Sequence, residues 1–141
     1  PPTDLALQTV SAIRNLADVV QGGLKSLAVT CWQLKPSEVP TELASVENDV
    51  ELMVDLVSHL SGLLDAGTLN LDEMMTLAEA TRKSNLALAM AKSHSDWRGC
   101  ARILLNKLEP QLERLAQCSD DAHIGLLKAG RRPFATGAKT G

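Results

Sequence analysis

Apolar residues in the first third of the chain recur at alternating spacings of four and three. The series passes through the adjacent glycines Gly22 and Gly23 without losing its phase, and it comprises Ala6, Val10, Ile13, Ala17, Val20, Leu24, Leu27, Cys31 and Leu34. This spacing places the side chains along one face of an α-helix, and a turn at the glycines would have no reason to preserve it. The pattern therefore predicts one continuous helix that begins near Thr3, as its N-cap, and ends before Pro36.

The glycine pair inside this helix needs a compensating feature, because two glycines destabilise a helix interior by about 2 kcal/mol relative to two alanines. The neighbouring stripe of the helix becomes small where Gly23 falls, and it comprises Ala12, Leu16, Val19, Gly23, Ser26 and Thr30. Small side chains let another backbone come close. We therefore expect Gly23 to mark a close approach by a neighbouring helix.

The same alternation returns in the second third of the chain, at Val39, Leu43, Val46, Val50, Met53, Val57, Leu60 and Leu64. It predicts a second helix from about Glu38 to Leu64. Pro40 would lie in the first turn of this helix, where a missing backbone N–H is tolerated. Gly67 is the expected stop signal.

A third helix is expected from Leu71 to Lys92. Asn70 followed by Glu73 resembles a capping box, and Leu69 with Met74 is expected to form a hydrophobic staple. The inward face of this helix is narrow, and it comprises Met74, Ala78, Thr81, Asn85 and Leu88. The helix is therefore expected to pack closely and to bury less apolar surface than the first two.

The last helical segment has its apolar positions at Trp97, Ala101, Leu104, Leu108, Leu112 and Leu115. Either Ser93 or Ser95 is expected to cap its start. Pro110 falls inside the pattern, where it removes a backbone hydrogen bond and clashes with the preceding turn. We therefore expect a kink near residues 106–109, or two shorter helices.

Four amphipathic helices of about 22 to 30 residues with short connections predict an all-α, antiparallel up-down-up-down four-helix bundle. After Cys118 a short, separate C-terminal helix is expected to end at Gly130, so that one domain spans residues 1–130 and a flexible basic tail spans residues 131–141. In helix number and length this architecture resembles the focal-adhesion-targeting and vinculin-type bundles. No motif carries that resemblance, and it assigns no binding residues.

Composition agrees with a helical chain and narrows the class of partner. There is no Tyr, one Phe and two Trp, whereas strands usually combine aromatic with β-branched residues. Residues 1–94 hold 6 basic and 12 acidic side chains, and residues 95–141 hold 8 basic and 5 acidic ones. The acidic first part argues against nucleic-acid binding, which requires a broad basic surface.

No apolar run approaches the length of a transmembrane helix, and no secretion signal is visible, so no membrane span is expected. The chain opens with Pro1 and no methionine, as expected of a domain cut from a longer protein or of a processed N-terminus. Cys31, Cys100 and Cys118 are far apart and form no C-x-x-C pair. This usage is typical of a reducing compartment, and we expect a cytoplasmic protein.

Four polar residues in the second segment, Glu47, Glu51, Asp55 and His59, lie four residues apart and form one stripe. Metal sites in helical bundles need such ligands to face inward, usually with Glu-x-x-His pairs. Here the apolar series occupies the inward face, and the chain contains no Glu-x-x-His. The histidines also lack the His-x-Leu-Lys-Gly pattern of phosphotransfer modules. We predict a solvated acidic face, with no metal site, no cofactor and no catalytic residue.

The first two helices carry more large apolar residues than one core face uses. We predict that the surplus forms a partner-binding surface, comprising Leu5, Leu16, Val19, Gly23, Leu52, Leu56 and Leu63. It would accept the apolar face of an amphipathic helix from another protein, or a second copy of this chain, although wide apolar stripes inside a bundle explain the same residues equally well. The leading hypothesis is a non-enzymatic scaffold or adaptor module. The alternatives are a bundle that binds a lipid-like small molecule and an acidic metal-dependent hydrolase.

Overall fold

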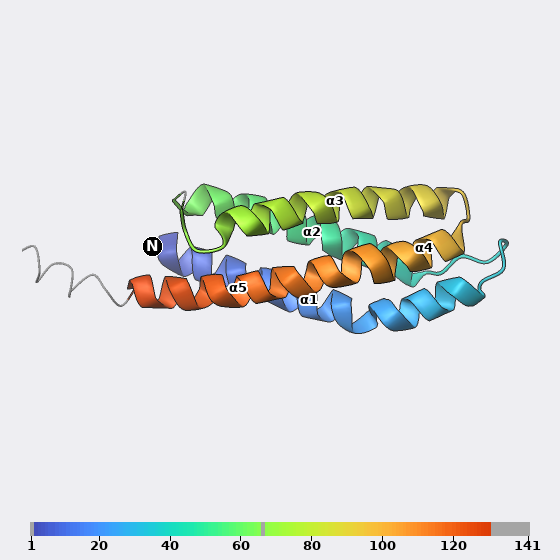
Figure 1. Cartoon of the computed structure of the whole chain (residues 1–141), viewed down its shortest axis with the longest axis horizontal. Helices are drawn as coiled ribbons and strands as arrows, with labels where there is room; N and C mark the ends of the chain where they lie inside the picture. Colours follow the sequence, from blue (N-terminus) through green and yellow to red (C-terminus); the bar gives the residue numbers. More distant parts are fainter. Residues whose placement is uncertain (1, 66, 131–141) are drawn as a thin grey trace, which may run out of the picture.

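The computed structural model describes residues 2–65 and 67–130, and within those ranges every regular element is helical. The predicted tail at residues 131–141 lies outside the described residues. The elements are α1 (Pro2–Gln33), α2 (Glu42–Leu63), α3 (Leu71–Ser93), α4 (Trp97–Ile103), the π-helical turn η1 (Leu104–Leu108) and α5 (Glu109–Gly130). The last three follow one another without a break and form the fourth rod of a four-helix bundle (Figure 1).

Polar contacts between the helices show that neighbours run in opposite directions. Lys92 near the end of α3 pairs with Glu47 near the start of α2 at 2.7 Å. Arg14 and Lys25 of α1 pair with Asp120 and Glu109 of α5, in reversed order along the chain. Figure 1 likewise shows the chain reversing at alternate ends of the bundle. The predicted four-helix bundle is confirmed.

The apolar series at alternating spacings of four and three, here called the heptad series, is confirmed as the core face of α1. From Ala6 to Cys31 its members are at most 6% exposed, and only Leu34, beyond the helix end, is half-buried. The apolar positions of the fourth rod are also buried, namely Trp97, Ala101, Leu104, Leu108, Leu112 and Leu115. The indole N–H of Trp97 donates to the Lys35 carbonyl at 3.2 Å, which attaches the start of α4 to the segment after α1. One continuous core therefore joins all four rods.

The second helix begins later than the sequence predicted. Glu42 is its first residue, Val39 is 67% exposed, and Pro40 is buried in the connecting segment. The residue before a proline is disfavoured in the helical region of backbone space, so Val39 cannot readily extend the helix backwards through Pro40. At the other end, Gly67 lies four residues beyond the last helical residue, Leu63, with φ of +96°.

The predicted capping box and staple at the start of α3 are wrong. Asn70 has left-handed backbone angles, with φ of 63°, and its side chain makes no cap hydrogen bond. Its amide donates instead to Asp121 of α5 at 3.2 Å. Glu73 is bound by Arg114 rather than by the backbone of Asn70. Leu69 is 55% exposed, so it does not close over the buried Met74. Contacts with α5 have replaced local capping.

The predicted cap of the fourth rod is also wrong, since Asp96 takes the role expected of Ser93 or Ser95. The carboxylate of Asp96 accepts a hydrogen bond from the Gly99 N–H at 2.9 Å. Ser93 still belongs to α3 and donates to the Met90 carbonyl at 2.7 Å. Ser95 has a left-handed φ of 54° in the turn between the two helices.

The disruption of the helix predicted from Pro110 takes the form of a π-helical turn over Leu104–Leu108. Proline lacks an N–H and crowds the carbonyl four residues earlier, and a wider turn relieves both problems. The separate C-terminal helix expected after Cys118 is not found, because α5 continues from Glu109 to Gly130. Ala122 and Leu126 are buried along this extension, and their packing against the core holds the helix together.

Candidate functional site

Gly22 and Gly23 lie inside α1, as the continuous heptad series predicted. The accompanying expectation, that Gly23 marks a close approach by a neighbouring helix, is wrong. Both glycines are exposed, and a Cβ atom added at either one would meet nothing within 4 Å. The missing side chain at Gly23 leaves open space beside the helix rather than a tight contact.

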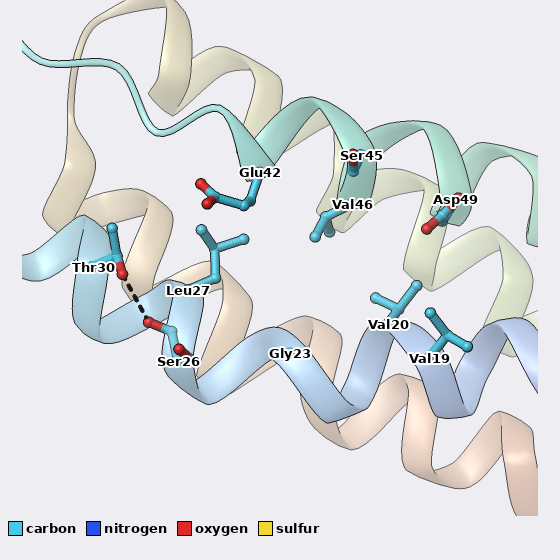
Figure 2. Close-up of a pocket in the computed structure, with 10 residues that line it drawn as sticks. All are labelled: Val19, Val20, Gly23, Ser26, Leu27, Thr30, Glu42, Ser45, Val46 and Asp49. Carbon is cyan, nitrogen blue, oxygen red and sulfur yellow. Dashed lines mark hydrogen bonds between the residues drawn. The ribbon is translucent and has the colours of Figure 1, made fainter.

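That space is a groove between α1 and α2, of about 350 Å³. Figure 2 shows Gly23 on α1, with the side chains of Val20, Leu27 and Val46 directed into the gap between the two helices. The lining consists of Val19, Val20, Gly23, Ser26, Leu27, Thr30, Glu42, Ser45, Val46 and Asp49. Val19 is 69% exposed at the edge of the groove. The middle of the groove is therefore apolar and partly uncovered.

The two ends of the groove on α2 carry carboxylates. Glu42 and Asp49 line it, and within the described part of the chain neither of them forms an ion pair. On α1, Thr30 donates its hydroxyl to the Ser26 carbonyl at 3.1 Å, so that hydroxyl is satisfied within its own helix. The groove thus combines an apolar floor with negative charge along one edge.

Of the seven residues predicted to bind a partner, only Val19 and Gly23 line this groove. Leu5 and Leu52 are 43% and 49% exposed, and they supply further uncovered apolar surface on the same two helices. Leu16 and Leu56 are half-buried against the core, and Leu63 is half-buried at the end of α2. Leu16 and Leu56 therefore serve bundle packing at least in part, as the competing explanation required.

The acidic stripe of α2 does not form one site. Glu47 is half-buried and bound by Lys92, whereas Glu51 and Asp55 are exposed. Glu51 and Asp55 line a separate hollow between α2 and α3, together with Val50, Val54, Arg82, Asn85 and Leu86. Within residues 2–65 and 67–130, no group of three or more His, Cys, Asp or Glu side chains could hold a metal ion.

Sequence reasoning missed the α2 side of the groove, which consists of Glu42, Ser45, Val46 and Asp49. A signal for it existed. In an antiparallel pair joined by a short connection, the first turns of α2 must lie opposite the last turns of α1. Val46 belongs to the apolar series of the second helix, and nothing in the spacing marks Val46 or Asp49 as part of a groove. The register of the two helices was needed to place both residues opposite Gly23.

The thiols offer little nucleophilic chemistry. All three cysteines are free and buried. Burial raises the pKa of the Cys31 thiol, and it raises the pKa of the Cys118 thiol to about 11. A thiol that stays protonated is a poor nucleophile at neutral pH.

None of the helices described here is both long enough and apolar enough to cross a membrane. No protein-family model matches the chain, and comparisons with curated proteins and with solved structures also gave no match. The groove must therefore be interpreted from its own geometry and charge.

Proposed function

We propose that this protein is a non-enzymatic interaction module of scaffold or adaptor type, and that the α1–α2 groove binds an amphipathic helix of another protein. The observation that carries the proposal is the apolar opening at Gly23. The floor residues Val20, Leu27 and Val46 lie around a position that has no side chain. An apolar side chain from a partner helix can occupy the space that a Cβ at Gly23 would fill, as in other helix-in-groove complexes.

Charge on the groove favours a partner helix with basic flanks. Glu42 and Asp49 lie about two helical turns apart on α2, and neither is neutralised within the described residues. Lysine or arginine residues beside the apolar face of a partner would meet these carboxylates. Such rim charges mainly set orientation and association rate, whereas the apolar contacts supply most of the affinity. The free, buried cysteines suit a reducing compartment, and we therefore propose that the module acts in the cytoplasm.

The first test uses the two glycines as a matched pair. The probe is a Leu/Lys amphipathic peptide of about 18 residues, long enough to be helical when bound. Gly23→Leu fills the groove, whereas Gly22→Leu adds the same side chain one position away, outside the residues that line it. We expect Gly23→Leu to weaken binding at least about tenfold and Gly22→Leu to change it less than about twofold, measured by isothermal titration calorimetry. Equal affinities for both variants would remove the groove from consideration.

A control on charge uses two neighbouring carboxylates of α2. Asp49→Asn neutralises the groove, whereas Asp55→Asn neutralises an exposed residue that faces the α2–α3 hollow instead. We expect only Asp49→Asn to reduce the affinity for the lysine-rich peptide.

Whether a second copy of this chain occupies the groove is tested by sedimentation of the protein alone at two concentrations. A dimer that Gly23→Leu dissociates and Gly22→Leu leaves intact would assign the groove to a second copy of this chain.

A further inference from the structure

A second uncovered apolar surface lies where the end of α1 meets the fourth rod, away from the α1–α2 groove. We call it the Trp32 patch, and its residues are Ala28, Val29, Trp32, Gln33, Ala101 and Leu105. Ala28 and Ala101 are 2% and 3% exposed and form the floor. Val29, Trp32 and Leu105 are 55%, 46% and 39% exposed and stand around it. The hollow between them has a volume of about 190 Å³.

Two arginines of α4 lie over the exposed indole of Trp32. The guanidinium carbons of Arg98 and Arg102 are 4.9 Å and 5.7 Å from the ring centroid. Contact with an aromatic face orients a guanidinium and leaves its N–H groups available at the edge. In the described part of the chain, the side chain of neither arginine forms a hydrogen bond or an ion pair with another residue. Two oriented cations without a carboxylate partner thus border an apolar hollow.

We infer that the Trp32 patch is a second binding site, and that its ligand is a short acidic peptide segment carrying one or two large apolar side chains. The hollow is the size of such side chains, and its lining contains no carboxylate. The partner's Asp or Glu residues would pair with Arg98 and Arg102, since guanidinium binds carboxylate through two parallel hydrogen bonds. Nearby, Lys25 and Glu109 are 3.7 Å apart and offset each other's charge. The free positive charge at the patch is therefore that of the two arginines.

This chemistry favours a peptide over a nucleic acid or a lipid surface. Phosphate backbones are bound by extended rows of cations, and here only two arginines border a mostly apolar lining. Anionic membranes likewise attract clusters of several basic residues. The site is also independent of the α1–α2 groove, because the two surfaces share no lining residue and carry opposite charge. A lysine-rich peptide is expected at one and an acidic peptide at the other.

The test uses an acidic peptide of about 15 residues with Leu at helical spacing, and a matched peptide in which Lys replaces every Glu. Binding is followed by calorimetry and by tryptophan fluorescence. Because Trp97 is already buried at 5% exposure, a blue shift of the emission on binding is assigned to the exposed Trp32. We expect saturable binding of the acidic peptide, a blue shift of the emission, and an affinity that falls when NaCl is raised from about 0.05 M to about 0.5 M.

Two variants and one control locate the site. Arg98→Gln with Arg102→Gln, and separately Trp32→Ala, should each weaken binding of the acidic peptide at least about tenfold. Arg82→Gln with Lys83→Gln removes two charges from exposed positions on α3, and it should change affinity less than about twofold. Thermal unfolding of each variant checks that it is folded. Because Arg98 and Arg102 are exposed, their double variant keeps the test valid if Trp32→Ala is unstable.

Several results would overturn the inference. One is the absence of acidic-peptide binding at about 1 mM. Another is equal binding of the lysine peptide at this patch, and a third is unchanged affinity in the Arg98/Arg102 variant. Tighter binding of duplex DNA or of phosphatidylserine vesicles than of the acidic peptide, lost in the same variant, would reassign the patch to phosphate ligands.

Discussion

Individual residues in this protein show how a missing side chain can shape a surface. Gly22 and Gly23 are consecutive, both exposed, and both free of neighbours at the Cβ position. Only Gly23 lines the groove, because successive residues of a helix point about 100° apart. Gly99 is different, since a Cβ there would overlap the Asp96 carboxylate that caps α4. Glycine is therefore required for packing at one of these three positions and not at the other two.

These environments predict opposite effects of alanine on stability. Gly22→Ala and Gly23→Ala should each raise the free energy of unfolding by about 1 kcal/mol, because alanine is the better helix former and has room. Gly99→Ala should lower it by about 1 kcal/mol, because the new methyl group displaces the cap. Urea unfolding of the three variants measures all three effects. If Gly22→Ala or Gly23→Ala proved destabilising, the glycines would not lie in an unobstructed helix.

The helices themselves were predictable where the apolar period is long and regular. The α1 series, the four-rod count and the break near Pro110 all follow from spacing and from the chemistry of proline. The ends of the helices were predicted less well, because they depend on contacts with other helices, which the apolar period does not reveal. Asn70 binds Asp121 of another helix instead of capping its own, and Val39 is excluded from α2 by the proline that follows it. The groove could not be predicted from either helix alone, because its position depends on the register between α1 and α2.

The start of α4 offers a direct test of how that element is capped. Asp96→Ala should lower the free energy of unfolding by about 1 kcal/mol, because the Gly99 N–H loses its acceptor. Asp96→Asn should retain most of the stability, because asparagine is an equally good N-cap. Ser93→Ala and Ser95→Ala should have smaller effects than Asp96→Ala. Thermal unfolding of the four variants shows whether Asp96 caps α4, as in the structure, or whether Ser93 or Ser95 does, as the sequence suggested.

Across the whole molecule, α1 is the common wall of both proposed binding surfaces. One side of it faces α2 at the acidic groove, and the end of it meets α4 at the basic Trp32 patch. The core between these surfaces is continuous, and buried residues from every rod contribute to it. Binding at either surface therefore acts on one cooperative unit, and a residue at the centre of that unit should report its unfolding.

Cys100 is such a residue. Its thiol is fully buried, and burial, reinforced by Cys31 of α1, raises its pKa from 9.0 to about 12. Asp96, the cap of α4, and Glu47 of α2 raise the pKa of this thiol further by smaller amounts, and Lys92 of α3 lowers it, so all four rods influence this group. The folded protein holds the Cys100 proton at pH values where the unfolded chain has released it. Stability from this source is complete below about pH 9 and is lost as the pH rises towards 12.

We therefore expect the urea midpoint to stay constant from neutral pH up to about 9 and then to fall steadily, with a shallower fall in Cys100→Ala. Cys118, whose pKa is raised to about 11, and Cys31, whose pKa is also raised by burial, supply the remaining slope. At pH 8 a thiol reagent should modify Cys100 only as fast as the bundle unfolds, because the reactive thiolate is exposed only then. Destabilising the adjacent cap of α4 with Asp96→Ala should raise that labelling rate, whereas stabilising α1 with Gly22→Ala should lower it. If neither substitution changed the labelling rate of Cys100, this end of the bundle would open locally, without the cooperative unfolding that a single continuous core requires.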